Sequence, residues 1–415
     1  MKTLRILTAW LVLLLVPALL TVTGGPREAS AAGPEFVIGQ MIDLSGPTQT
    51  IGPYWSKGSQ DYIRLFNKRH TDFSIRLFEI DHGYTVPRGI EAYERFKQAG
   101  ALSVSLYGTP HTAALTPRLT EDKLLGTAPG FGTSAATDGT KFPYVFPVAA
   151  TYWSQMGGAI KFVLDDWKKA GKSGMPKIAY AFYDNPAGRE PLPIIEDLAK
   201  RVGFKLQTYA VPPPGIDMRA QVLDITRKYQ ADWVITHLFG QGPSVSIKEL
   251  NRMGFPIDHL ISFVWGAAES DVSAAGAGPS EGYYALEFAG VGDNFDVIRD
   301  IKKMYQDEGQ PLPKEMAVSV YYNRGVFIAA LHARAIELAF QKYGPNLDGE
   351  KVRRAMETIS NFDLGGFLPP LNLSAKDHEG GGWVRVWQVK SGKFVPATDW
   401  FQGYRDVILE HVGKS

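Results

Sequence analysis

Short apolar segments alternate with longer amphipathic segments from residue 36 onward. Residues 36–42 have the apolar character of a buried strand, 44–47 that of a turn, and 54–69 that of a helix. Apolar strands separated by helices form parallel sheets that are covered on both faces, so this pattern predicts an α/β domain. The same alternation predicts strands at 74–79, 102–106 and 124–128, and helices at 87–99 and 110–122.

The alternation starts again after a long amphipathic helix. Met156, Ile160, Val163 and Trp167 recur at helical spacing, and Gly171 provides a stop. Two doubly wound domains of similar size leave a cleft between them, and ligands of open parallel sheets bind beyond the carboxyl ends of the strands. The second round predicts strands at 177–182, 204–210, 232–237 and 260–264, and helices at 189–202, 218–229 and 244–253.

The last third of the chain predicts a different order: a strand at 283–288, helices at 295–308, 318–341 and 351–359, and a hairpin at 383–389 and 393–395. Residues 365–370 are rich in glycine and proline, which suits a crossing between lobes or a surface loop. We therefore expect two doubly wound parallel-sheet lobes joined by a multi-strand hinge. The first lobe comprises 33–148 with 283–363 and the second 149–282 with 364–415, although the tail is able to pair with either lobe.

The first 32 residues have the pattern of a secretory signal peptide. Lys2 and Arg5 precede the apolar run 6–20, and small residues at 29–32 fit a cleavage site. No later apolar run is long enough to span a bilayer. We therefore expect an exported, soluble protein in a periplasm.

Composition removes several classes of function. The formal net charge is +1, which gives no indication of a nucleic-acid partner. The chain has no cysteine, so disulfides, cysteine metal sites and a lipid-modified cysteine are excluded and no lipid anchor is expected. The histidines form no close ligand motif, so we predict no metal and no cofactor.

Several short segments, in this order and spacing, resemble the periplasmic binding proteins for branched-chain amino acids, the type I solute receptors of ABC importers. The resemblance implies a monomeric, two-lobed receptor that closes over a small solute and delivers it to a membrane permease. The segments are 37–58 with its Leu-Ser-Gly-Pro turn, Ala128-Pro129-Gly130, Tyr183-Asp184-Asn185, Ser280-Glu281-Gly282 and Asp377-His378-Glu379-Gly380.

In that family, a hydroxyl and backbone amides at strand ends of the first lobe hold the carboxylate of the ligand. The matching loop here contains Thr109, Pro110 and His111. Thr109 suits an N-cap and Pro110 a first helical position, so free amides of the helix would face the cleft as an anion site. A second anion-facing loop is expected at Gly130-Phe131-Gly132, where the glycines allow close approach of the backbone. Whether Thr109 only caps the helix, and whether His111 contacts ligand or packs, stay open.

The chain departs from the family at positions that would recognise an amino acid. Ile51 and Ala187 stand where tyrosines are common, and Trp265 stands at the position of the acidic partner of the ammonium group. A buried cation needs an opposite charge, so we predict a carboxylate ligand with an aromatic or apolar body. Glu269 stays open as an alternative ammonium partner. Trp265, Phe131, Phe239 and Tyr183 are expected to form an aromatic pocket.

Two motifs that are typical of enzymes lack their structural context. Residues 278–282 match G-x-S-x-G, but a loop is expected before Ser280 and a strand after it, whereas a nucleophile elbow joins a strand to a helix. Gly171-Lys172-Ser173 lacks the upstream glycine of a phosphate loop. We therefore predict a binding protein and not an enzyme, with an amino-acid receptor, a sensory receptor of the same fold and a secreted hydrolase as alternatives. Tyr152 and Trp153 lie between the lobes, and we expect one of them to pack in the hinge.

Overall fold

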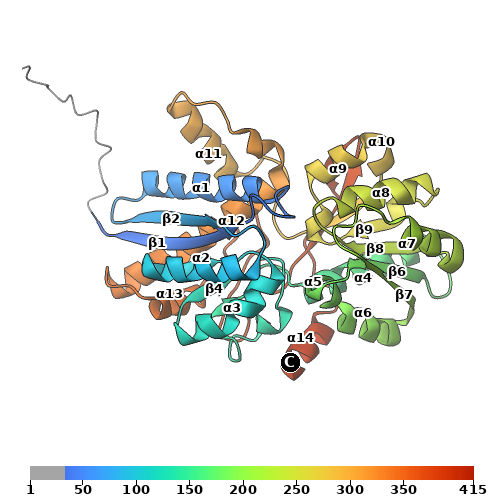
Figure 1. Cartoon of the computed structure of the whole chain (residues 1–415), viewed down its shortest axis with the longest axis horizontal. Coiled ribbons are helices and arrows are strands. Elements are labelled where there is room, and N and C mark those ends of the chain that lie inside the picture. Colours follow the sequence, from blue (N-terminus) through green and yellow to red (C-terminus); the bar gives the residue numbers. More distant parts are fainter. Residues whose placement is uncertain (1–32) are drawn as a thin grey trace, which may run out of the picture.

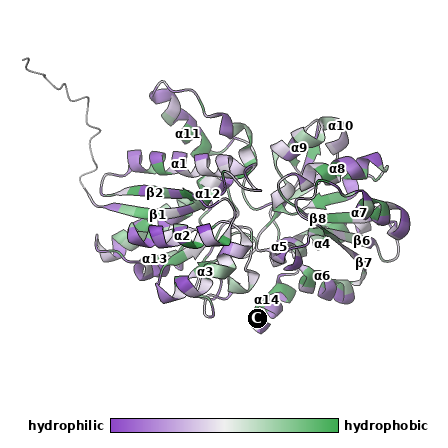
Figure 2. Ribbon diagram, in the orientation of Figure 1, coloured by the Kyte–Doolittle hydropathy of each residue, from purple (hydrophilic) through white to green (hydrophobic). Residues whose placement is uncertain are grey.

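The computed structural model describes residues 33–415 and has two α/β lobes that lie side by side (Figure 1). The predicted signal peptide lies outside the described residues. Apolar residues concentrate in the strands and on the inner faces of the helices, while the outward helix faces are polar (Figure 2). Within 33–415 no helix has the length and hydropathy needed to cross a bilayer.

The first lobe has a five-stranded parallel sheet of order β2-β1-β3-β4-β5. The strand of residues 35–42 lies between two neighbours in this sheet and is mostly apolar, and all of it except Glu35 is buried, as expected for a strand with helices on both faces. The strands are β1 (Glu35–Ile42), β2 (Ser74–Asp81), β3 (Ala101–Ser105), β4 (Leu125–Thr127) and β5 (Val145–Phe146), and the intervening helices are α1 (Gly52–Arg69), α2 (Val86–Gln98) and α3 (Thr109–Glu121).

Three later helices return to this lobe: α11 (Asp296–Asp307), α12 (Ser319–Tyr343) and α13 (Gly349–Met356). The long helix α12 packs along α1. Glycines permit this close approach, because a Cβ on Gly58 would clash with the Tyr322 carbonyl and one on Gly325 with the Trp55 carbonyl. The first lobe is therefore completed by residues far away in the sequence.

The second lobe has a seven-stranded sheet of order β12-β11-β10-β9-β8-β6-β7, parallel except for the antiparallel pairs that β11 makes with β10 and β12. The segment predicted as one helix at 189–202 is divided into two helices and a π turn. The strands are β6 (Lys177–Tyr183), β7 (Lys205–Val211), β8 (Trp233–His237), β9 (Leu260–Ser262), β10 (Tyr284–Glu287), β11 (Arg385–Lys390) and β12 (Lys393–Pro396). The helices are α4 (Tyr152–Lys169), α5 (Pro186–Arg189), α6 (Leu192–Leu198), α7 (Arg219–Leu223), α8 (Gly242–Arg252), α9 (Glu269–Ala275), α10 (Ala277–Ser280) and the terminal α14 (Arg405–Lys414).

The chain crosses between the lobes after β5, after β10 and again before β11, which corrects two expected boundaries. The strand placed at the start of the segment returning to the first lobe, β10, pairs with β9 and β11 in the second sheet. Residues near 378, assigned to the second lobe, lie against the first. The sequence pattern identifies a strand or loop but carries no information about the sheet that receives it.

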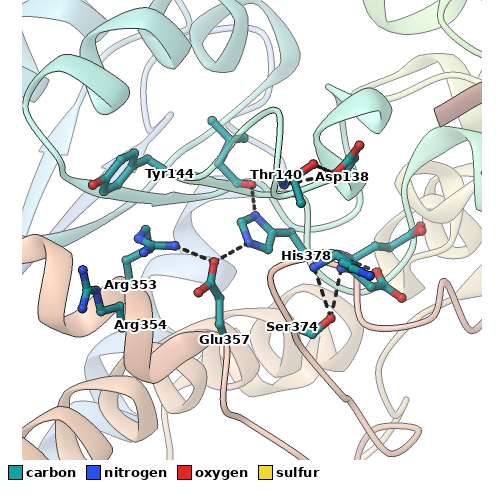
Figure 3. Close-up of polar contacts among 12 residues, drawn as sticks. Asp138, Thr140, Tyr144, Arg353, Arg354, Glu357, Ser374 and His378 are labelled. Atoms are coloured by element: carbon teal, nitrogen blue, oxygen red, sulfur yellow. Dashed lines mark hydrogen bonds and ion pairs between the residues drawn. The ribbon is translucent and has the colours of Figure 1, made fainter. Parts of the chain in front are cut away.

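His378 anchors the last crossing to the first lobe (Figure 3). Its buried ring stacks on Phe146 with centroids 3.6 Å apart. Its Nδ1 lies 2.9 Å from the Val145 carbonyl and its Nε2 3.1 Å from Glu357 Oε1. The next residue, Glu379, accepts a hydrogen bond from the Thr151 amide at 2.6 Å in the first crossing. Two of the crossings are thus held together by hydrogen bonds.

Candidate ligand-binding site

A cavity lies between the two lobes at the carboxyl ends of their strands, as the sequence predicts, and its empty space, including the part open to solvent, is about 340 Å³. The first lobe contributes the loops that follow β1 to β4, and the second contributes the loops that follow β8 and β9. None of the side chains that line this cavity is charged. The lining residues are Thr48, Ile51, Tyr84, Tyr107, Gly108, Phe131, Tyr152, Phe239 and Trp265.

Trp265 forms a wall of this cavity and links the two lobes. Its indole ring stacks on Trp55 with centroids 6.3 Å apart and lies 5.9 Å from the ring of Phe131. Its Nε1 donates a hydrogen bond to the Gly130 carbonyl at 3.2 Å. A large aromatic surface therefore forms this wall of the cavity, at the residue where the resemblance led us to expect a change from an acidic group.

Arg324 on α12 lies behind Trp265 and is fully buried. Its guanidinium carbon is 5.0 Å from the centre of the Trp265 ring, which is a cation–π distance. It donates hydrogen bonds to the Val264 carbonyl at 2.6 Å and to Glu287 Oε2 at 2.8 Å. Burial raises the pKa of Glu287, and the adjacent guanidinium opposes that rise. This buried pair joins a helix of the first lobe to the second sheet.

The N-terminus of α3 reaches the cavity through Gly108. Gly108, with φ of 91°, occupies the N-cap position, and Thr109 is the first helical residue, so the expectation that Thr109 is the N-cap is wrong. A glycine accepts this left-handed backbone without the strain that threonine would suffer. The amides of the first turn still lack intrahelical partners, which leaves the helix start suited to an anion.

Two hydroxyl groups beside this helix start are buried. Tyr107 is 4% exposed and Thr109 is 6% exposed. Neither hydroxyl makes a hydrogen bond of good geometry among residues 33–415, although the Thr48 side chain approaches that of Tyr107 and the Tyr152 side chain approaches that of Thr109. Burial raises the pKa of Tyr107 well above its ordinary value, so this phenol stays protonated and able to donate. A hydrogen-bond acceptor in the cavity would give both hydroxyl groups a well-placed partner.

His111 lies behind the wall of the cavity and does not line it. It is fully buried, with its ring 4.3 Å from that of His82 and 5.2 Å from that of Tyr84. Burial lowers the pKa of both histidines, to about 4 for His82. Two neutral imidazoles thus support Tyr84 from behind. Pro110 is likewise absent from the lining.

The loop expected to form a second anion site makes contacts with other parts of the protein. The Gly130 amide donates to the Val148 carbonyl at 3.2 Å. Beside Gly132 lies the carboxylate of Glu190, which accepts hydrogen bonds from the Ser134 amide and hydroxyl, both at 2.6 Å. Glu190 occupies the space beside Gly132, and neither Gly130 nor Gly132 lines the cavity, so this loop does not present the expected anion site to it. Phe131 between them does line the cavity.

Glu269, the alternative ammonium partner, makes its hydrogen bonds outside the cavity. Its carboxylate accepts hydrogen bonds from the Ser319 amide at 3.2 Å and the Val320 amide at 3.3 Å, at the start of α12. Because an anion is stabilised at a helix N-terminus, this contact ties α9 of the second lobe to the first lobe. Glu269 does not line the cavity.

The structure brings Phe131, Phe239 and Trp265 together in the cavity, whereas Tyr183 lines a neighbouring cavity nearer the surface. Thr109 is adjacent to the lining residue Gly108. Tyr152 lines the cavity, whereas the Trp153 indole donates to the Glu190 carbonyl at 2.9 Å, which is a contact within the second lobe, so the expectation that one of this pair packs in the hinge stays a prediction. Sequence reasoning did not single out Thr48 and Tyr84, although both lie in loops just after strands, which was the available signal.

The serine of the G-x-S-x-G match is not presented to a cleft. Ser280 ends the short helix α10, where a loop was expected, and its hydroxyl donates to the Gly276 carbonyl at 2.7 Å. The strand β10 follows it, so the order is helix to strand and the opposite of a nucleophile elbow.

Comparisons with known proteins agree with this architecture. The family model described as "Periplasmic binding protein" matches residues 35–393. No curated protein sequence matches the chain significantly. A crystal structure described as an ABC transporter permease from the Pseudomonas fluorescens group is 31% identical, with a TM-score of 0.82, and the alignment covers 92% of this chain and 95% of that one.

More distant structures share the fold. A branched-chain amino acid ABC transporter protein from Thermus thermophilus with bound valine is 18% identical, with a TM-score of 0.79 and coverage of 91% of this chain and 98% of that one. A fatty acid ABC transporter substrate-binding protein from Thermomonospora curvata is also 18% identical, with a TM-score of 0.76 and coverage of 91% and 95%. This chain therefore belongs to the periplasmic binding protein family, the substrate-binding proteins that bind small ligands for ABC transporters.

Proposed function

We propose that this protein is the periplasmic receptor of an ABC importer and binds a small carboxylate with an aromatic or apolar body in preference to an α-amino acid. It acts as a monomer, is not lipid-anchored, catalyses no reaction and delivers its ligand to the permease after the lobes close. The carboxylate lies at the start of α3, where Tyr107 and Thr109 supply hydroxyl groups, and the body lies against Trp265 and Phe131.

One observation carries the ligand class: the cavity is aromatic and contains no charged side chain. A carboxylate is accommodated by hydroxyl and amide donors at a helix start. An ammonium ion has no such option, because a buried cation needs an anionic partner and Glu269 is bound to α12. Relatives described as binding valine and as serving fatty acid transport show that this fold accepts both ligand classes.

Matched ligand pairs test the proposal. We expect 3-phenylpropanoate to bind more tightly than phenylalanine, and 4-methylpentanoate more tightly than leucine, in isothermal titration calorimetry. The alcohol 3-phenylpropanol serves as the uncharged control and should bind more weakly than the acid. A ligand at a hundredfold above its Kd should add about 2.7 kcal/mol to the free energy of unfolding, which a thermal shift detects.

Tight binding of leucine or phenylalanine, with no binding of the acids that lack the amino group, would contradict the proposed ligand class. Equal affinity for 3-phenylpropanol and 3-phenylpropanoate would show that the cleft has no anion site. A genome neighbourhood with permease and ATPase genes supports transport, whereas a membrane kinase gene alone would favour a sensory receptor.

A further inference from the structure

The cavity at Trp265 adjoins a second, larger one. The outer cavity has a volume of about 920 Å³, against about 340 Å³ for the inner one. Tyr84 and Phe239 line both. The two spaces therefore share a wall, which consists of this pair of aromatic rings.

These two rings come from opposite lobes. Tyr84 follows β2 in the first lobe and Phe239 follows β8 in the second, and their ring centroids are 6.5 Å apart. Both side chains are partly exposed. Each ring is supported from its own lobe, Phe239 by Tyr183 at 4.7 Å and Tyr84 by His111 at 5.2 Å. Lobe closure thus brings together an aromatic constriction between the inner and the outer cavity.

The wall of the outer cavity is also uncharged and is apolar over part of its area. Pro47 of the first lobe faces Pro213, Pro214 and Ile216 of the second, with Gln49 and Gln241 among the polar residues. Ile216 is 64% exposed, so its side chain is available to a ligand that enters this cavity. The apolar part of a ligand that extends from the inner cavity would pack against Ile216.

We propose that the ligand is an elongated monocarboxylate, whose carboxylate lies at the start of α3 and whose apolar body displaces the rings of Tyr84 and Phe239 from each other and extends into the outer cavity. This inference rests on the proposed function and specifies its substrate class. A compact acid would occupy only the inner cavity, whereas an elongated acid also buries apolar surface against the prolines and Ile216. Each additional buried methylene should tighten binding about fourfold.

The test uses a series of ω-phenylalkanoates on the full mature protein. We expect the Kd from calorimetry to fall from benzoate through 3-phenylpropanoate to 5-phenylpentanoate. Two variants narrow the outer cavity from opposite lobes, Thr50→Trp and Ile216→Trp, and each should raise the ratio of the 5-phenylpentanoate Kd to the benzoate Kd at least tenfold. Met175→Trp is the matched control, because Met175 is 59% exposed on the second lobe and lines neither cavity.

The outcomes separate the two proposals. If no acid of the series binds the wild-type protein, the proposed function fails. If benzoate binds as tightly as 5-phenylpentanoate and neither tryptophan variant changes the ratio, the ligand is compact and only the elongated class is overturned. Thermal unfolding of each unliganded variant identifies any loss of fold, and Thr50→Ala and Ile216→Ala, which should weaken 5-phenylpentanoate selectively, replace a variant that does not fold.

Discussion

Replacing Tyr107 by phenylalanine should stabilise the unliganded protein and weaken ligand binding. The change removes one hydroxyl that is buried and makes no hydrogen bond of good geometry among residues 33–415, with Thr48 as its polar neighbour, and it keeps the ring that packs against Trp55 at 5.9 Å. An unsatisfied buried polar group costs about 1–3 kcal/mol, so Tyr107→Phe should raise the free energy of unfolding by about 1 kcal/mol or more. A buried hydroxyl that only supports the fold would show the opposite sign.

The loss in binding follows from the same hydroxyl. A hydrogen bond to a charged group contributes about 1.5–3 kcal/mol, which corresponds to a roughly 10- to 100-fold higher Kd for a carboxylate ligand. Urea unfolding of the unliganded protein and calorimetry with 3-phenylpropanoate measure the two effects on the same sample. The expected signature is higher stability combined with lower affinity.

Tyr93→Phe provides the matched control. Tyr93 is fully buried in the first lobe, and its hydroxyl donates to Asp122 Oδ2 at 2.7 Å, away from the cavity. Its removal should lower the free energy of unfolding by about 1 kcal/mol and leave the Kd unchanged. If Tyr107→Phe behaves like Tyr93→Phe, with lost stability and unchanged affinity, the hydroxyl of Tyr107 is structural and the carboxylate site lies elsewhere.

Two further predictions concern Trp265 and His332. Ligand binding should change tryptophan fluorescence, and Trp265→Phe should lose most of that change because this indole lines the cavity; an undiminished change in the variant would remove Trp265 from the site. The buried imidazole of His332 lies 2.7 Å from Ser103 Oγ and 2.9 Å from Thr127 Oγ1, and burial lowers its pKa to about 3 against 6.5 unfolded. Below pH 6.5 the imidazole of His332 therefore binds a proton in the unfolded chain but stays neutral in the folded chain. Its contribution to the free energy of unfolding is fully present above pH 6.5 and falls as the pH decreases toward 3, by about 2 kcal/mol at pH 5. Urea titrations at pH 8 and pH 5 measure the free energy of unfolding of the wild type and of His332→Gln. Between pH 8 and pH 5 the wild type should lose about 2 kcal/mol more than the variant, and an equal loss in both would contradict the argument.

The sequence by itself determined the local elements and the general position of the site. The apolar run of β1 and the helical spacing in α4 depend only on neighbouring residues, so both were predicted to within a few positions. The place of Phe131, Phe239 and Trp265 at the cavity follows from a general rule, because the loops after parallel strands gather at one edge of a sheet. The absence of an acidic residue at Trp265 was likewise visible without a structure.

Only the tertiary structure decided which distant segments meet. A strand such as β10 shows its burial in its sequence but not its neighbours, and its pairing with β11 depends on residues about a hundred positions later. The residues next to Glu190 and Glu269 do not indicate that these side chains bind Ser134 and the start of α12. The structure was therefore needed to show that the loop at Gly130 and Gly132 does not present an anion site and that Glu269 is not available as an ammonium partner. Hydrogen bonds and ring contacts between the lobes depend on how the whole chain folds. Local sequence patterns therefore carry no information about them.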